Sequence, residues 1–231
     1  MKKGISIFLV MVFCSQVFGQ KSITMGLGSF TPKGNFKKTL SDAQPGGLSM
    51  QFNSGIKQIP KLEWGLDFGI VMYTYREYDV TFTPKGKTTP KTIAVYEDDC
   101  MIQMGVNSKY SFWRDRTFMP YATVQTGVNK FFSHIDPVEE NTGYESKFKW
   151  QGNAAYAGFG IGTRVDLSRL FGNKTATYKF ILDLSNTWNA GSVASYRYFK
   201  NDEAPHENLD FGVHRTATPF GQFKCSFGLF W

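Results

Sequence analysis

The sequence alternates between large apolar residues and small or polar residues with a period of two. In residues 62–70 the even positions are Leu62, Trp64, Leu66, Phe68 and Ile70, and the odd positions are Glu, Gly, Asp and Gly. Because successive side chains of a β-strand point to opposite faces, this pattern predicts a strand with one apolar face. The alternation recurs in seven further segments: 23–28, 48–53, 100–109, 121–132, 157–166, 179–188 and 223–231. The chain is therefore expected to be all-β, with eight strands.

The second face of these strands is small, polar and rich in glycine. A soluble sandwich or barrel would turn the large apolar residues inward and expose Lys, Glu and Thr. In a small transmembrane barrel the large apolar residues meet lipid, and small or polar side chains fill a narrow lumen. We therefore predict an eight-stranded antiparallel up-and-down transmembrane β-barrel. The main soluble alternative is a secreted lipocalin-like barrel with an apolar interior, and the charged inward face argues against it.

The connections between the predicted strands alternate in length. Four are long and polar: 32–46, 76–95, 133–147 and 190–215. Three are shorter: 55–61, 113–118 and 167–177. Outer-membrane barrels have long extracellular loops and short periplasmic turns. We therefore predict four long outer loops, three short inner turns, both termini in the periplasm and a location in the cell outer membrane.

Aromatic residues gather near the ends of the predicted strands. Aromatic rings with a polar edge favour the interface between headgroups and hydrocarbon, where they form girdles around transmembrane barrels. The residues predicted to form such girdles are Tyr73, Tyr75, Phe112, Trp113, Phe131, Phe132, Trp150, Tyr178, Trp188, Tyr196 and Tyr198.

The first nineteen residues are typical of a secretory signal peptide. Two lysines precede an apolar stretch over 5–13, and the small residue Gly19 stands at the expected cleavage site. Nine apolar residues are too few to cross a bilayer as a helix. We therefore predict a signal peptide over 1–19 and a barrel domain over 20–231. Removing the two lysines lowers the net charge from +7 to +5.

Ionisable side chains are expected on the inward face of the barrel. The alternation places four acids and four bases there: Glu63, Asp67, Asp166 and Asp183, with Lys109, Arg164, Lys179 and Lys224. An isolated charge in a narrow lumen would be unfavourable to desolvate, so we expect ion pairs. About half of these residues are expected at strand ends, in contact with solvent. The lumen is therefore predicted to be plugged and not an open pore.

The chain stops on an aromatic residue at the end of an alternating strand, with Phe227, Leu229 and Trp231 on one face. This arrangement resembles the terminal signal that outer-membrane barrel proteins present to the barrel-assembly machinery. Together with Phe18-Gly19-Gln20 at the end of the signal peptide, the whole pattern resembles the eight-stranded outer-membrane β-barrels of Bacteroidota. That group includes OmpA-like, OmpX-like and PorT-like barrels. The sequence departs from OmpA-like proteins because no periplasmic peptidoglycan-binding domain follows, so cell-wall anchoring is not implied.

The resemblance implies outer-membrane lipid and lipopolysaccharide as surroundings, and the barrel-assembly machinery as a partner. Nucleic acid is not an expected partner. The basic residues expected to face anionic lipopolysaccharide are Lys33, Lys37, Lys38, Lys85, Lys87 and Lys91. Three functions stay open. The protein could be a structural or interaction component that contacts other envelope proteins, an accessory subunit of an envelope machine such as type IX secretion, or a narrow channel for small solutes.

No sequence motif predicts catalysis or a cofactor. The glycines of 158–162 share one strand face and no helix pattern follows them, which favours packing in the lumen over a nucleotide loop. Ser133 and His134 are adjacent, so on a strand they point to opposite faces and do not form a nucleophile–base pair. His206 and His214 could meet in the fourth outer loop, which is weak support for a metal site. We therefore predict a protein without enzymatic activity, cofactor or metal.

Overall fold

The computed structural model describes residues 18–39, 45–82, 88–138, 148–173, 177–199 and 211–231. Its strands are β1 (Phe18–Pro32), β2 (Gly46–Ile56), β3 (Ile59–Phe82), β4 (Lys91–Ser111), β5 (Phe118–Val138), β6 (Phe148–Asp166), β7 (Lys179–Gly191), β8 (Val193–Phe199), β9 (Phe211–Ala217) and β10 (Phe220–Phe230). The described helices are α2 (Gly34–Thr39) and α3 (Leu167–Leu170). Among the described residues, no helix has the length and apolar character needed to cross a membrane.

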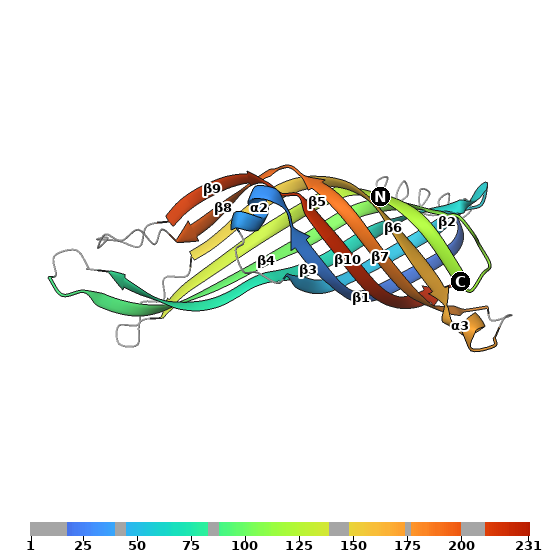
Figure 1. Ribbon diagram of the computed structural model, residues 1–231, viewed down its shortest axis with the longest axis horizontal. Helices are drawn as coiled ribbons and strands as arrows, with labels where there is room; N and C mark the ends of the chain where they lie inside the picture. Colours follow the sequence, from blue (N-terminus) through green and yellow to red (C-terminus); the bar gives the residue numbers. More distant parts are fainter. Residues whose placement is uncertain (1–17, 40–44, 83–87, 139–147, 174–176, 200–210) are drawn as a thin grey trace, which may run out of the picture.

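Within these residues, eight strands close into a barrel in the order β1-β10-β7-β6-β5-β4-β3-β2 (Figure 1). Every ladder of the barrel is antiparallel, and closure occurs where β1 pairs with β10, with Ile23 opposite Leu229. Neighbours in the barrel are also neighbours in sequence, except that β8 and β9 form a separate two-stranded ribbon between β7 and β10. Closure leaves no sheet edge along the barrel wall. The prediction of an all-β, eight-stranded antiparallel barrel is confirmed.

The outward face of the barrel carries the large apolar side chains that the alternation assigned to it. Those exposed on the surface include Met25, Leu27, Leu48, Phe52, Trp64, Leu66, Phe68, Ile70, Met104, Val106, Val124, Phe159, Ile161, Trp188 and Phe227. Leu27 and Phe159 are 68% and 64% exposed, while the side chains between the exposed positions point into the lumen. A continuous apolar surface of this extent is unfavourable in water and favourable in hydrocarbon. The polarity of the barrel is therefore that of a transmembrane barrel.

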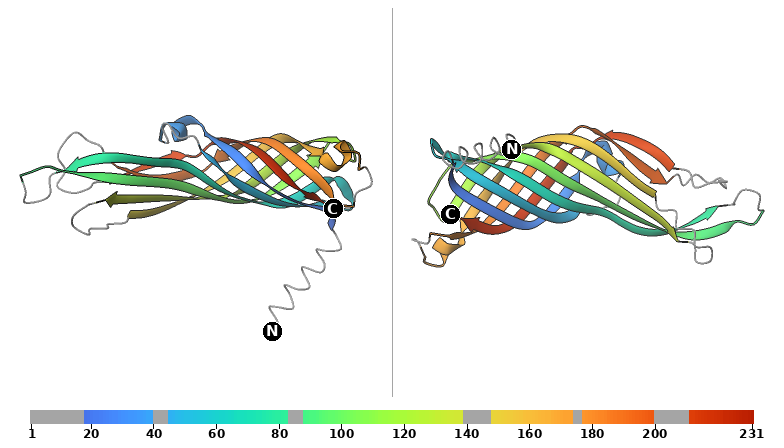
Figure 2. Two further views of the ribbon diagram at one scale, coloured as in Figure 1. Left: turned by 90° about the horizontal axis from the view of Figure 1, so that it is seen from below. Right: turned by 180° about the vertical axis from the view of Figure 1, so that it is seen from behind.

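Several strands are longer than the sequence pattern indicated. β3 has 24 residues and β4 has 21, and their pairing continues until Phe82 stands opposite Lys91 (Figure 2). Residues 76–95, expected as a polar loop, therefore lie largely in a hairpin. β5 likewise runs to Val138 and enters the expected loop 133–147. The alternating pattern marks only the part of each strand that faces lipid, whereas backbone hydrogen bonding between paired strands continues beyond it.

The other two connections predicted as long loops also contain regular structure. Helix α2 occupies part of 32–46, and the β8–β9 ribbon occupies both ends of 190–215. The three short turns lie at the opposite end of the barrel, together with α3 and the last residue of the chain (Figure 1). Residues 1–17 of the predicted signal peptide lie outside the described residues, and β1 begins at Phe18.

Exposed aromatic side chains gather at the short-turn end: Tyr110, Phe112, Trp113, Phe118, Phe171, Tyr178, Phe180 and Trp231. This is the arrangement of a girdle at a membrane interface. One predicted girdle residue is wrong, because Phe131 is fully buried in the lumen. Phe131 and Phe132 are adjacent on a strand, so their rings point to opposite faces. The side chains of Tyr73, Tyr75, Trp150, Tyr196 and Tyr198 lie outside the described part of the structure.

Candidate functional site

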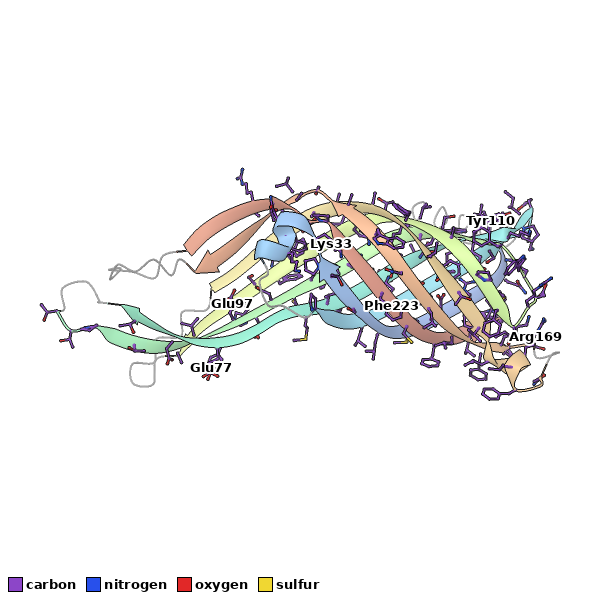
Figure 3. All side chains as sticks on the ribbon, viewed as in Figure 1. Lys33, Glu77, Glu97, Tyr110, Arg169 and Phe223 are labelled. Carbon is purple, nitrogen blue, oxygen red and sulfur yellow. The ribbon has the colours of Figure 1, made fainter. Side chains whose placement is uncertain are left out.

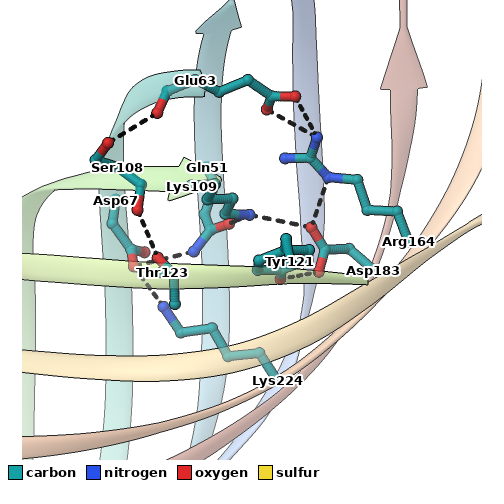
Figure 4. A network of polar contacts seen from close by, with 10 residues as sticks. All are labelled: Gln51, Glu63, Asp67, Ser108, Lys109, Tyr121, Thr123, Arg164, Asp183 and Lys224. Atoms are coloured by element: carbon teal, nitrogen blue, oxygen red, sulfur yellow. Dashed lines mark hydrogen bonds and ion pairs between the residues drawn. The ribbon is translucent and has the colours of Figure 1, made fainter. Parts of the chain in front are cut away.

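Six of the eight ionisable residues expected in the lumen meet in one buried cluster (Figure 4). They are Glu63 and Asp67 on β3, Lys109 on β4, Arg164 on β6, Asp183 on β7 and Lys224 on β10. Together with Gln51 and Tyr121, which bind them, these residues are called the charged layer below. Three carboxylates face three cations, so attraction within the layer offsets the desolvation of each group. The layer ties opposite walls of the barrel together.

Arg164 links two carboxylates across the lumen. Its Nη1 lies 2.7 Å from each carboxylate oxygen of Glu63, a residue 101 positions away in sequence. Its Nε lies 3.3 Å from Oδ2 of Asp183, its cross-strand neighbour on β7. The guanidinium also stands 5.5 Å from the ring centre of Tyr121 and 5.9 Å from that of Phe230. Arg164 is 2% exposed, so these contacts are made out of reach of bulk water.

Lys109 and Tyr121 complete the environment of Asp183. The Nζ of Lys109 lies 3.0 Å from Oδ2 of Asp183, and the hydroxyl of Tyr121 donates to Oδ1 at 2.5 Å. The Lys109 ammonium also donates to Oε1 of Gln51 at 2.8 Å and stands 4.9 Å from the Tyr121 ring centre. Glu63 is directly opposite Lys109 in the β3–β4 register, yet the ammonium turns to Asp183 and Gln51. Strand register alone therefore does not determine which charged side chains form ion pairs.

Asp67 forms the second centre of the charged layer. The Nζ of Lys224 lies 2.5 Å from its Oδ2, although the two residues are 157 positions apart. Gln51 donates to the same oxygen through Nε2 at 3.1 Å. Because Gln51 also accepts from Lys109, it joins the Asp67 pair to the Asp183 group in one continuous network. Asp67 is fully buried, so the carboxylate relies on these two donors.

The remaining two predicted residues, Asp166 and Lys179, lie at the short-turn rim. Asp166 caps α3, where its side chain accepts a hydrogen bond from the backbone N–H of Arg169 at 2.9 Å. Lys179 stands 3.9 Å from Asp166 and 3.6 Å from the exposed carboxylate of Asp115. These two residues therefore belong to the end of the barrel and not to the charged layer.

A neutral amide layer follows the charged layer along the lumen. Gln222 donates to Gln103 at 3.1 Å, and Gln125 donates to Asn189 at 2.7 Å. All four side chains are buried. On β10, Gln222 lies two residues closer to the long-hairpin end than Lys224. On β4, Gln103 likewise lies closer to that end than Lys109. The lumen thus changes from ionic to neutral in that direction.

An aromatic layer lies in the lumen toward the long-hairpin end. Phe36 of α2 is completely buried and reaches the rings of Phe30 and Phe131, with centroid distances of 6.3 Å and 6.1 Å. Phe30 in turn stacks on Phe220 at 4.3 Å, and Tyr156 lies 5.9 Å from Phe220. Helix α2 belongs to the connection between β1 and β2, so one of the long connections contributes a ring to the lumen.

Glycines allow the lumen to be this narrow. A Cβ on Gly162 would lie 2.4 Å from Cζ of Tyr121, so only glycine leaves room for the ring that holds Asp183. A Cβ on Gly158 would similarly lie 2.1 Å from Oδ1 of Asn189 in the amide layer. The Gly158–Gly162 run therefore packs against the lumen side chains.

The other residues considered for chemistry are separate from the lumen layers. The hydroxyl of Ser133 donates to Oδ1 of Asp99. His134 follows on the opposite face of β5. No group of three or more His, Cys, Asp or Glu within the described residues is placed to hold a metal ion. His206 lies outside the described residues, as does the side chain of His214.

The three residues of the predicted assembly signal follow the outward face of β10. Phe227 is 60% exposed and Trp231 is 44% exposed, while Leu229 is partly covered. The backbone of Trp231 exchanges two hydrogen bonds with Lys21, at 2.7 Å and 2.9 Å. The last residue is therefore held at the seam where β1 and β10 close the barrel.

Comparison with known proteins finds structural likeness only. No protein-family model matches the chain, and no curated protein matches its sequence. Ail, the attachment invasion locus protein of Yersinia pestis, is 10% identical with a TM-score of 0.47, covering 92% of this chain and 99% of Ail. Neisserial surface protein A is 11% identical with a TM-score of 0.46, covering 92% and 97%. The outer membrane protein OprG of Pseudomonas aeruginosa is 14% identical with a TM-score of 0.33, covering 92% and 96%.

The class of protein is defined by the chain's own geometry. A closed antiparallel barrel of eight strands, with an exposed apolar wall and a buried charged interior, is a transmembrane β-barrel of the outer-membrane type. The chain is therefore a small outer-membrane β-barrel protein.

Proposed function

We propose that this protein is a non-conducting barrel that acts as a structural or interaction component of the envelope. The observation that carries the proposal is the charged layer across the lumen, in which Arg164 lies between Glu63 and Asp183. The amide and aromatic layers add two further barriers along the same path. A solute crossing the barrel would have to displace all three layers. The proposed function therefore lies on the outside of the barrel and not in transport through it.

The proposed orientation places the three short turns in the periplasm and the long hairpins outside the cell. In this orientation Lys33 and Lys37, which are both exposed near α2, would face anionic lipopolysaccharide. Lys85 and Lys87 lie outside the described residues, as do the side chains of Lys38 and Lys91. Phe227, Leu229 and Trp231 would be read by the barrel-assembly machinery. A bacteroidotal origin remains a prediction from the sequence resemblance.

The long hairpin of β3 and β4 supports an interaction role. The pairing of β2 with β3 ends at Gly46 opposite Met72, whereas β3 and β4 continue together for a further nine pairs. This part of the sheet projects beyond the barrel wall (Figure 2). The same projection favours the second candidate, an accessory subunit of an envelope machine such as type IX secretion, because such a subunit needs a contact surface outside the lipid.

Two experiments test the proposal. The first uses a deletion strain that carries either the wild type or a variant with residues 76–97 replaced by a short turn. After cross-linking of the envelope, other envelope proteins should co-purify with the wild type and not with the variant. A secretion defect in both the deletion and the hairpin variant would favour the accessory subunit.

The second experiment is a liposome-swelling assay with small sugars, in which the purified wild type should give no flux. Rapid flux would overturn the closed-lumen proposal and favour the channel.

A further inference from the structure

The short-turn end of the barrel carries a ring of basic side chains outside the charged layer, of which Arg114 contacts that layer at 3.7 Å from Glu63. The β2–β3 turn region contributes Lys57 and Lys61, and the β4–β5 turn contributes Arg114 and Arg116. The β6–β7 connection contributes Arg169, and β7 begins with Lys179. Lys21 adds a cation at the β1–β10 seam. These residues are called the basic rim. Figure 3 shows Arg169 at this end and Glu77 on the opposite hairpin.

Few carboxylates neutralise the basic rim. Apart from Glu63 of the charged layer, the described side-chain carboxylates at this end are those of Asp115 and Asp166. Both lie next to Lys179, and Asp166 also lies 4.0 Å from Arg169. Lys57, Lys61 and Arg116 are exposed and form no ion pair with any carboxylate in the described part of the chain. The rim therefore presents uncompensated positive charge to its surroundings.

The charges are distributed around the circumference of the barrel. In the barrel order, the β1–β10 seam and the three short turns mark four successive quarters of the wall, and each quarter carries at least one basic residue. A single protein partner would contact one sector of this ring. A shell of lipid surrounds the barrel on all sides, so lipid headgroups can contact basic residues in all four quarters of the ring.

An aromatic girdle stands next to the basic rim. Trp113 and Tyr178 are exposed at the same end, and the guanidinium of Arg116 lies 5.7 Å from the ring centre of Trp113. Phe171, directly after α3, is 83% exposed. Aromatic rings mark the boundary between hydrocarbon and headgroups, so cations adjacent to them lie at the level of the phosphates.

From these observations we infer that the basic rim binds the phosphate headgroups of anionic phospholipids. Under the proposed orientation these lipids belong to the periplasmic leaflet of the outer membrane, and only that assignment rests on the proposed function. The attraction is electrostatic and acts at the bilayer surface, so it weakens as added salt screens the charges. The expected lipid is one with net negative charge, such as phosphatidylglycerol, in preference to a zwitterionic lipid.

The inference can be tested with the full-length mature barrel in bilayers of defined composition. Electron spin resonance of spin-labelled phosphatidylglycerol and phosphatidylcholine gives the relative association of each lipid with the barrel. The wild type should prefer phosphatidylglycerol at low salt and lose the preference at high salt. The double variant Lys57→Gln/Lys61→Gln should lower the preference by about twofold or more. The matched control Lys57→Arg/Lys61→Arg keeps both charges at the same positions and should retain the preference.

Equal preference in the wild type and the Lys57→Gln/Lys61→Gln variant would overturn the inference. So would an equal loss in the control, because the preference would then not depend on the charge at these two positions. Loss of an acidic co-purifying protein from the rim variant, with lipid preference unchanged, would replace lipid by a protein partner. A separate experiment tests the proposed orientation. If the variant Lys57→Cys were labelled from outside intact cells, the basic rim would be assigned to the outer leaflet, and the lipid preference itself would still hold.

Discussion

Replacing Arg164 by Met should destabilise the barrel because it leaves a buried carboxylate without its partner. The substitution keeps a long side chain and removes the charge that holds Glu63 at 2.7 Å. Asp183 retains Lys109 at 3.0 Å and Tyr121 at 2.5 Å, so this carboxylate loses little stabilisation compared with Glu63. Among the ion pairs of the described residues, Glu63 then retains only the one with Arg114 at 3.7 Å, made by a side chain that is 21% exposed.

The magnitude follows from this difference between the two carboxylates. Removing one partner of a buried ion pair lowers the free energy of unfolding by about 3–5 kcal/mol. The double variant Arg164→Met/Glu63→Gln removes both charges and should recover about 2 kcal/mol or more of that loss. Lys179→Met is the matched control at the rim. Its side chain is 17% exposed, its ammonium lies 3.9 Å from Asp166, and Asp166 keeps Arg169 at 4.0 Å, so the loss should stay below about 1 kcal/mol.

The assay is reversible urea unfolding of the refolded barrel in detergent micelles or small vesicles, followed by tryptophan fluorescence and by heat-modifiable gel migration. The reasoning would be refuted if Arg164→Met and Lys179→Met lost the same free energy of unfolding. It would also be refuted if adding Glu63→Gln to Arg164→Met deepened the loss, because the two residues would then act independently.

Three further predictions concern the other parts of the barrel. Gly162→Ala should lower the free energy of unfolding by about 1–3 kcal/mol through contact with Tyr121, whereas Gly221→Ala, whose Cβ would meet nothing closer than 3.7 Å, should lose less; similar losses in the two variants would contradict this. Phe36→Ala should speed amide hydrogen exchange in α2 by about a hundredfold, measured by mass spectrometry, because its ring is fully buried; unchanged protection would remove Phe36 from the aromatic layer. Trp231→Ala should slow the appearance of heat-modifiable barrel in cells. Because the side chain is 44% exposed, the variant should change the free energy of unfolding of the purified protein by less than about 1 kcal/mol. Normal assembly in cells would count against the predicted assembly signal.

The barrel could be predicted from the sequence because alternation is a local property of each strand. Residues 62–70 alone assign Glu63 and Asp67 to the lumen and Trp64 and Phe68 to the exterior, and the described side chains have these positions. The closure of β1 on β10 follows from the inverted polarity of all eight segments, since an open sheet would expose an edge to lipid.

The partners within the lumen could not be predicted from alternation. Lys224 meets Asp67 from a position 157 residues away, and the contact depends on barrel stagger and side-chain rotamers that the pattern does not contain. Phe36 lies in a connection expected as a polar loop, and α2 is too short to give a helical periodicity. Tyr121 and Phe131 enter the lumen against the rule that its side chains are small or polar. A signal was available for Phe131, because two adjacent rings on a strand must face opposite sides.

The most direct test of the central claim is the conductance of the purified mature barrel in a planar lipid bilayer. With the charged, amide and aromatic layers in place, the wild type should insert, show heat-modifiable migration when recovered, and carry no steady current under an applied voltage. A stable open channel of nanosiemens size in the wild type would contradict the closed lumen and the function built on it.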